Sequence, residues 1–128
     1  LARATEYAKT RVVFDRPIGQ NQAIQHPLAQ SWMELEAAWM MTMRAAGLYD
    51  SGEACGVDAN AAKYLAGEAG FQACTRALMT HGGMGYAKEF HVERLLREVL
   101  IARLAPVSPE LILCPHIAEK ALGLPKSY

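Results

Sequence analysis

Apolar positions along the chain recur at steps of three and four residues, over long stretches that contain few Gly or Pro residues. Such steps place apolar side chains on one face of an α-helix. The pattern predicts helices over residues 1–14, 21–51, 58–81, 92–104 and 109–122. Apolar–polar alternation never extends beyond a few residues, and no segment is repeated. We therefore expect an all-α fold, an antiparallel four- to five-helix bundle in a single domain over residues 1–128.

Gly and Pro residues mark where these helices should begin and end. The first helix should end at a loop that contains Pro17 and Gly19, because Pro lacks an amide donor and Gly tolerates unusual dihedral angles. Asp58 is suited to cap the N-terminus of the third helix, which should end at the three glycines between positions 82 and 85. Pro115 should kink the last helix.

The second and third helices differ in the size of their apolar side chains. The third helix is rich in Ala and Gly, which let neighbouring helices approach closely. The second helix carries large residues at helical spacing, and we expect this stripe to pack against sister helices. Its members are Leu28, Trp32, Leu35, Trp39, Met43 and Ala46.

Composition excludes several classes of protein. Thirteen basic residues balance thirteen acidic ones, so nothing favours an electrostatic interaction with nucleic acid. No apolar run approaches the roughly 20 residues of a membrane span, and we expect none. The three cysteines include no CxxC motif, which argues against a disulfide framework or a zinc site and favours neutral thiols in a reducing compartment.

The sequence lacks the spacings of nucleophilic or metal-dependent catalysis. None of the four histidines or three cysteines sits in a nucleophile-activating motif. A di-iron bundle needs Glu-x-x-His on two helices, whereas this chain has one reversed pair, His116 and Glu119. We therefore expect no metal, and capping, surface or core roles for the histidines.

Two segments could bind an anion or an aromatic ring. The glycines at 82, 83 and 85 could let a phosphate approach the backbone amides, although a simple turn between helices has the same composition. No strand precedes them, so they do not form a Rossmann fingerprint. In a helix that extends to residue 14, Arg11 and Phe14 share one face. Arg11 could then pair with a diphosphate and Phe14 could pack on a ring; the alternative is a surface Arg beside a core Phe.

Three motifs, in order and with matching gaps, resemble the acyl-CoA dehydrogenase family. Residues 11–22 (RVVFDRPIGQNQ) resemble its signature R-x-x-F-G-x-x-I/L-x-x-x-Q. Residues 81–86 (HGGMGY) resemble its G-G-x-G-Y/F turn, and residues 93–98 (ERLLRE) resemble the E-R-x-x-R-D helix that follows. The likeness covers nearly the whole chain. It implies the C-terminal helical bundle of a longer enzyme, which also has an N-terminal helical domain and a middle β-domain; a start at Leu1 without Met fits such a fragment.

The resemblance implies FAD as the cofactor. In the family, the flavin ring lies between the middle and C-terminal domains, and the adenine and diphosphate end reaches the C-terminal domain of a neighbouring subunit. Carried over position by position, the resemblance implies that Arg11 meets the diphosphate, Phe14 packs on the cofactor and Gln22 hydrogen-bonds near the adenosine end. Gly82 and Gly83 should let the backbone approach the neighbouring subunit's FAD.

The chain also departs from the family pattern. Asp15 replaces the usual Gly after Phe, and Met79 replaces a Gln that lies three residues before the paired glycines. Ser108 stands at a cofactor-contacting Thr, and Glu110 at the family's Glu/Gln position two residues later. Many members place the catalytic Glu in a motif like Y-E-G-T-S-E, where this chain has Pro106, and Pro cannot abstract a proton.

Three sources of the catalytic base stay open. Some family members keep the base on a helix upstream of the arginine motif, which would precede Leu1. Alternatively Glu110 acts as the base, or the parent enzyme is degenerate or specialised. We prefer the upstream helix, which sequencing upstream of Leu1 would test.

The resemblance implies α,β-dehydrogenation of an acyl-CoA thioester, as in fatty acid metabolism, with hydride transfer to FAD. Implied partners are sister subunits in a tetramer or dimer, the acyl-CoA substrate and an electron-transferring flavoprotein. We expect the isolated fragment to be inactive. We expect the parent enzyme to lie in the cytoplasm of a bacterium or, in a eukaryote, in the mitochondrial matrix. The alternatives are a non-catalytic helical oligomerisation module and a same-fold acyl-CoA oxidase or flavin monooxygenase.

Overall fold

The computed structural model describes residues 1–127. The structure confirms the all-α fold, to which one two-stranded hairpin is added. The elements in chain order are α1 (Ala2–Thr10), β1 (Val12–Val13), β2 (Arg16–Pro17), η1 (Ile18–Gln20), α2 (Gln22–Asp50), α3 (Gly56–His81), α4 (Gly83–Tyr86), η2 (Lys88–Phe90), α5 (Val92–Leu104), η3 (Pro109–Leu113) and α6 (Cys114–Lys120). The segments η1 and η2 are 3₁₀-helical, and η3 is π-helical.

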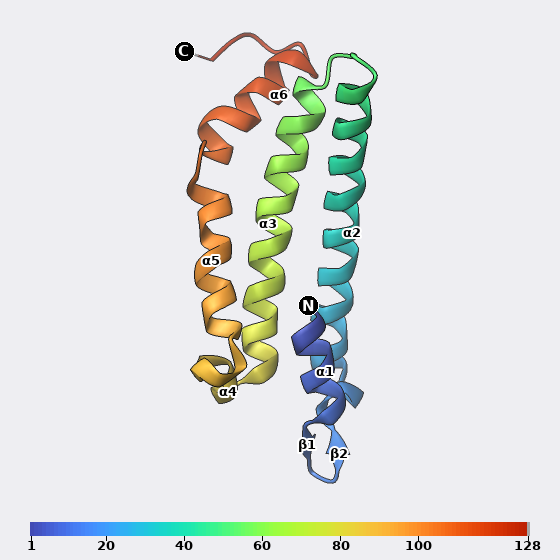
Figure 1. The fold of residues 1–128 in the computed structure, drawn as a ribbon, viewed down its shortest axis with the longest axis vertical. Coiled ribbons are helices and arrows are strands. Elements are labelled where there is room, and N and C mark those ends of the chain that lie inside the picture. The colour runs from blue at the N-terminus through green and yellow to red at the C-terminus, as the bar shows by residue number, and fades with distance from the viewer. Residues whose placement is uncertain (128) are drawn as a thin grey trace.

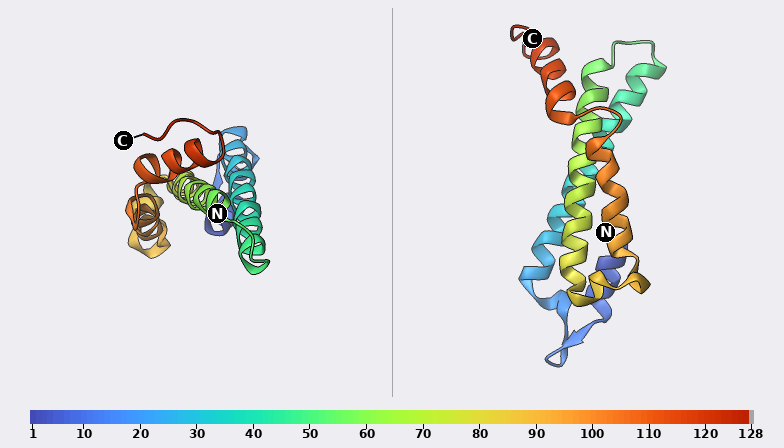
Figure 2. Two further views of the ribbon diagram at one scale, coloured as in Figure 1. Left: turned by 90° about the horizontal axis from the view of Figure 1, so that it is seen from above. Right: turned by 90° about the vertical axis from the view of Figure 1, so that its left-hand side faces the viewer.

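Helices α2, α3 and α5 stand side by side and alternate in direction, as in an antiparallel bundle (Figure 1). Helix α3 lies in the middle and contacts α2 on one side and α5 on the other. Helix α1 lies against the C-terminal half of α3 and the start of α2, and α6 crosses the opposite end of the bundle (Figure 2). The two ends of the bundle therefore carry different segments: the hairpin, α4 and the start of α5 at one, η3 and α6 at the other.

The first helix is shorter than predicted. It ends at Thr10, and Arg11 already has an extended backbone with φ −73° and ψ 113°. The hairpin β1–β2 occupies the rest of the segment, with Val12 opposite Pro17 and Val13 opposite Arg16. The prediction of one helix face shared by Arg11 and Phe14 is therefore wrong, because these residues lie on a helix cap and a hairpin turn.

Three other boundary predictions are also corrected. Asp58 does not cap α3, which begins after Cys55; its carboxylate pairs with the Arg44 guanidinium of α2 at 2.6 Å instead. The glycine-rich segment forms the short helix α4 rather than an open turn. The last predicted helix consists of two consecutive segments, the π-helix η3 and α6, with Pro115 as the second residue of α6. Because η3 continues directly into α6, the missing amide proton of Pro115 interrupts the helical hydrogen bonds near this junction.

Alanine supplies most of the core. Among residues 1–127, all but three of the buried apolar side chains are alanines, and the exceptions are Val92, Pro109 and Leu113. Side chains of this size let the axes of α2 and α3 approach closely, but each buries little apolar area. The buried alanines are Ala4, Ala8, Ala38, Ala45, Ala62, Ala69, Ala73 and Ala77.

The two tryptophans and Met43 in the large apolar stripe of α2 do not pack inside this chain, contrary to the prediction, whereas Leu28 and Leu35 of the same stripe are half-buried. Trp32 is 56% exposed and Trp39 is 60% exposed, and Met43 on the same stripe is also exposed. The buried positions of α2 are the small residues Ser31, Ala38 and Ala45, which recur every seven residues and face α3.

Ionic contacts fix α3 against both neighbours. The Arg76 guanidinium of α3 donates to the Glu34 carboxylate of α2 at 2.6 Å and to the buried Ser31 hydroxyl at 3.2 Å. The hydrogen bond from Arg76 holds the pKa of Glu34 below its usual value. On the other side of α3, Arg103 of α5 pairs with Glu68 at 2.6 Å and lies over the Phe71 ring.

The three cysteines are free thiols, as predicted, and burial raises the pKa of Cys74. No cluster of three potential metal ligands occurs within residues 1–127.

One segment, Val92–Lys120, is long and apolar enough to be considered as a membrane span. Its helix is interrupted at residues 105–108, so neither α5 nor η3 with α6 reaches the roughly 20 residues of a span. The expectation that no segment spans a membrane stays a prediction.

Candidate functional site

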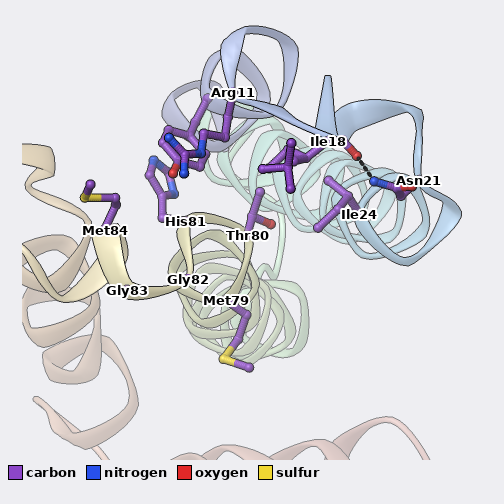
Figure 3. Close-up of a pocket in the computed structure, with 12 residues that line it drawn as sticks. Arg11, Ile18, Asn21, Ile24, Met79, Thr80, His81, Gly82, Gly83 and Met84 are labelled. Carbon is purple, nitrogen blue, oxygen red and sulfur yellow. Dashed lines mark hydrogen bonds between the residues drawn. The ribbon is translucent and has the colours of Figure 1, made fainter. Parts of the chain in front are cut away.

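A cavity of ≈ 500 Å³ opens at the hairpin end of the bundle, between the C-terminal ends of α1 and α3 and the start of α2 (Figure 3). It brings together residues that are far apart in the sequence, including three that the sequence predicted as ligand contacts: Arg11, Gly82 and Gly83. The other lining residues are Tyr7, Val13, Ile18, Asn21, Ile24, Met79, Thr80, His81 and Met84.

Arg11 supplies the positive charge of the cavity. Its amide donates to the Tyr7 carbonyl at 2.8 Å, and its carbonyl accepts from the Ile18 amide at 2.9 Å. The backbone amide and carbonyl of Arg11 are therefore both fixed by hydrogen bonds, while its side chain is exposed to solvent. None of the ion pairs found within residues 1–127 involves its guanidinium. An uncompensated guanidinium on a fixed backbone is suited to bind a diphosphate through charge-assisted hydrogen bonds.

Phe14 projects from the tip of the hairpin and is 92% exposed. Phe14 and Asp15 form the two-residue connection between the strands, with φ values of 52° and 60°. Two consecutive positive φ values are typical of a type I′ turn, which suits the twist of a hairpin. Asp tolerates this conformation, which explains how Asp15 can replace Gly, but a bulky residue such as Phe is strained in it. The hairpin thus holds an aromatic ring in solvent, at a conformational cost. Phe14 itself is not among the residues that line the cavity, whereas its neighbour Val13 is.

The glycines at the end of α3 leave their part of the cavity wall open. Gly82 has φ 58° and ψ −135°, a combination that favours glycine, and a Cβ added to Gly82 or Gly83 would meet no atom within 4 Å. A ligand can therefore approach the peptide groups here. Gly85 has the opposite role: a Cβ there would lie 2.5 Å from the Leu78 carbonyl oxygen, so glycine is needed for α4 to fold back on α3.

Gln22 is exposed at the first position of α2, next to the cavity but outside its lining. Its neighbour Asn21 lines the cavity instead. The Asn21 side chain donates to the Ile18 carbonyl at 3.0 Å and accepts from Arg16 at 2.9 Å, which braces the hairpin against α2. Met79, which stands where the family has Gln, also lines the cavity and is 72% exposed.

Pro106, Ser108 and Glu110 lie far from this cavity. They follow α5, whose 13 residues separate them from the glycine turn by about 20 Å at 1.5 Å per residue. The Ser108 hydroxyl donates to the Glu110 carboxylate at 3.5 Å, and Glu110 is exposed in the first turn of η3. The structure therefore divides the predicted site residues into two groups, at opposite ends of the bundle.

Sequence reasoning missed Tyr7, Asn21, Thr80 and His81. Asn21 and His81 lie within the quoted motif segments, Thr80 lies directly before one and Tyr7 one helical turn before the other, which is the signal that could have found them. The lining contains one cation, accessible backbone and several apolar side chains, but no carboxylate or thiol. It suits an anionic ligand that has an apolar part.

Comparisons with known proteins agree with this geometry. The family model described as "Acyl-CoA dehydrogenase, C-terminal domain" matches residues 1–120. The chain is 45% identical over its whole length to acyl-CoA dehydrogenase FadE12 of Mycobacterium tuberculosis, of which it spans 33%. Among solved structures, butyryl-CoA dehydrogenase of Megasphaera elsdenii superposes with a TM-score of 0.90 at 32% identity over 96% of this chain. The FAD complex of PigA superposes with a TM-score of 0.89 at 28% identity, also over 96% of this chain.

The chain spans about a third of the length of each of these proteins. Its match lies in the region that carries the arginine signature, the glycine turn and the helix that follows it. The chain therefore belongs to the acyl-CoA dehydrogenase family, as its C-terminal helical domain.

Proposed function

We propose that the chain is the C-terminal domain of a longer, three-domain, FAD-dependent acyl-CoA dehydrogenase. The observation that carries this proposal is the cavity that the Arg11 guanidinium shares with the open peptides of Gly82 and Gly83. Within residues 1–127 this guanidinium takes part in no ion pair. Membership of the family and the similarity to an FAD-bound structure support it.

The described residues fit a dinucleotide cofactor. Arg11 would hold the diphosphate, and Gly82 and Gly83 would border it because no Cβ fills the space beside them. Phe14 would offer its exposed ring to the cofactor, and Gln22 would hydrogen-bond near the adenosine end. When bound, FAD supplies a two-electron acceptor for an acyl-CoA thioester.

Ser108 and Glu110 would serve a different part of the catalytic assembly. Since α5 separates them from Arg11, we infer that the two ends of the bundle contact cofactor from different subunits, with the Arg11 end binding the adenine and diphosphate end of a neighbour's FAD. Pro106 has no proton-accepting side chain, so the base that removes the substrate's α-proton lies elsewhere. We propose an upstream helix for it, with Glu110 or a specialised parent enzyme as the alternatives.

The exposed apolar residues support burial in an assembly, as a tetramer or dimer. A core made mainly of alanine gives this domain little apolar burial of its own, whereas Trp32, Trp39 and Met43 stay exposed. Sister subunits and the other domains of the enzyme would cover them. We propose an electron-transferring flavoprotein as the electron acceptor, and the bacterial cytoplasm or the mitochondrial matrix as the compartment.

The test is Arg11→Ala in the full-length enzyme, with Arg3→Ala as the matched control. Arg3 is an exposed arginine of α1 that does not line the cavity. Loss of the Arg11 charge should weaken FAD binding about 10- to 100-fold, whereas the control should change it less than about threefold. Binding is measured by flavin fluorescence titration of the apoenzyme. Equal affinities of Arg11→Ala and wild type would contradict the proposal.

Activity assays separate the remaining functions. Reduction of an artificial electron acceptor by acyl-CoA indicates a dehydrogenase, and oxygen consumption indicates an oxidase or monooxygenase. If the full-length protein is purified without bound flavin, the function that remains is that of a non-catalytic oligomerisation module. The isolated 128-residue chain should be colourless and inactive; a yellow, active preparation would show that this domain is sufficient by itself.

A further inference from the structure

His81 is the last residue of α3 and lies in the cavity wall directly before Gly82. Only 4% of its surface is exposed, although most of the residues that follow it are open to solvent. The close-up shows its ring beneath Arg11, on the side where α1 meets α3 (Figure 3). None of the roles assigned above uses this buried imidazole.

Three contacts fix the ring of His81. Its Nδ1 lies 2.7 Å from the Ala77 carbonyl oxygen, and since a carbonyl can only accept, Nδ1 carries the proton and donates it. The ring stacks on Tyr7 of α1 with centroids 4.3 Å apart and an interplanar angle of 23°. Phe90 of η2 meets both rings edge-on, at 5.7 Å from each. A hydrogen bond and two aromatic contacts thus hold one orientation.

Tyr7 connects this ring to Arg11. The Arg11 amide donates to the Tyr7 carbonyl at 2.8 Å, so the two residues belong to the same final turn of α1. Deeper in the bundle, α1 and α3 meet through Ala4 and Ala77, which offer small surfaces and no directional contact. The stacked rings therefore set the separation of the two helix ends at the cavity, and with it the distance from the Arg11 backbone to the glycine turn.

We propose that His81 is a positioning residue for the diphosphate site: by stacking on Tyr7 it holds Arg11 opposite Gly82 and Gly83. The proposal rests on the proposed function of the cavity. His81 acts through Arg11 rather than on the ligand. Its effect on binding should therefore disappear when the Arg11 side chain is absent.

A double-mutant cycle in the full-length apoenzyme tests this, with ADP as the probe and titration calorimetry as the measurement. His81→Leu should weaken ADP binding about tenfold in the presence of Arg11, and less than about twofold in the Arg11→Ala background. His81→Phe, which keeps a ring against Tyr7, should recover affinity to within about threefold of wild type. Phe71→Leu is the matched control: it removes a ring from α3 ten residues away and should leave ADP affinity unchanged.

The outcomes separate this inference from the proposed function. If Arg11→Ala leaves ADP affinity unchanged, the proposed function fails. If Arg11→Ala weakens binding but His81→Leu does not, the positioning role alone fails. Equal losses of ADP affinity from His81→Leu with and without the Arg11 side chain would also overturn it, because a purely structural role makes the two effects additive. No recovery of affinity in His81→Phe would overturn it as well, because the stack on Tyr7 would then not be the cause. Should His81→Leu not fold, Tyr7→Leu removes the same stack from α1, and the same dependence on Arg11 is expected.

Discussion

The two faces of α2 differ in a way that the sequence pattern does not reveal. The face toward α3 carries Ser31, Ala38 and Ala45, all buried, whereas the adjacent face, about 100° around the helix, exposes Trp32 and Trp39. By hydrophobicity alone the second face should be the core. The reverse arrangement shows that close helix approach, not apolar volume, organises the interior of this domain. Large apolar residues on the other face are then available to contacts with other protein surfaces.

The largest effect should come from enlarging the inward face. Ala38→Leu inserts a branched side chain where α2 and α3 leave no room, and should lower the free energy of unfolding by about 3 kcal/mol. Trp39→Ser, one position away on the outward face, should change it by less than about 0.5 kcal/mol. Urea unfolding of the 128-residue chain, followed by circular dichroism, measures both. If the two variants lose similar amounts of unfolding free energy, the two faces of α2 do not differ in packing as described.

A second pair of substitutions compares a close backbone contact with an open helix surface. Gly85→Ala places a Cβ 2.5 Å from the Leu78 carbonyl oxygen, which cannot move without shifting α3, and should destabilise the fold by about 2 kcal/mol. Gly47→Ala lies in α2 with no atom within 4 Å of the added Cβ, and should stabilise it by about 0.5–1 kcal/mol. Thermal unfolding should show shifts of opposite sign. A neutral Gly85→Ala would mean that α4 does not pack on α3 as described.

The smallest effect concerns Glu34, whose carboxylate pairs with Arg76 of α3. Because Arg76 lowers the folded-state pKa of Glu34, the pair stabilises the fold above the usual pKa of Glu, and this contribution is lost as the pH falls through the lowered value. Glu34→Gln should therefore cost about 1 kcal/mol at pH 7. The difference from wild type should shrink as the pH falls from 7 towards 3, in unfolding experiments across this range. A constant difference across this range would show that the charge on Glu34 is not the cause.

Much of the fold follows from local patterns. The helix predicted over residues 92–104 has those bounds in the structure, and the helix predicted over 21–51 differs by one residue at each end. Both succeed because helical periodicity and Gly or Pro boundaries act through neighbouring residues. The hairpin was missed because Phe14 and Asp15 are not the Asn-Gly or Asp-Gly pair that is typical of a type I′ turn. Nothing local in the sequence indicates that Phe14 adopts a positive φ.

The candidate site divides in the same way. Family motifs pointed to Arg11, Gly82 and Gly83, and the structure brings these three into one cavity. The same motifs gave no indication that Ser108 and Glu110 lie at the other end of the bundle, since spacing along the chain does not show which way a helix runs. His81 was assigned only a general structural role, because the ring on which it stacks, Tyr7, lies 74 positions earlier in the sequence.

By itself, the sequence determined the helical class, most helix boundaries and the family signature, because each of these depends on residues within a few positions of one another. Tertiary structure alone decided which face of α2 turns inward, that Arg11 sits opposite the glycine turn, and that the remaining site residues lie at the far end of α5. Those features depend on the packing of helices that are distant in sequence. An apolar stripe shows that a helix face avoids water; which surface covers that face is settled by the shapes of the helices it meets.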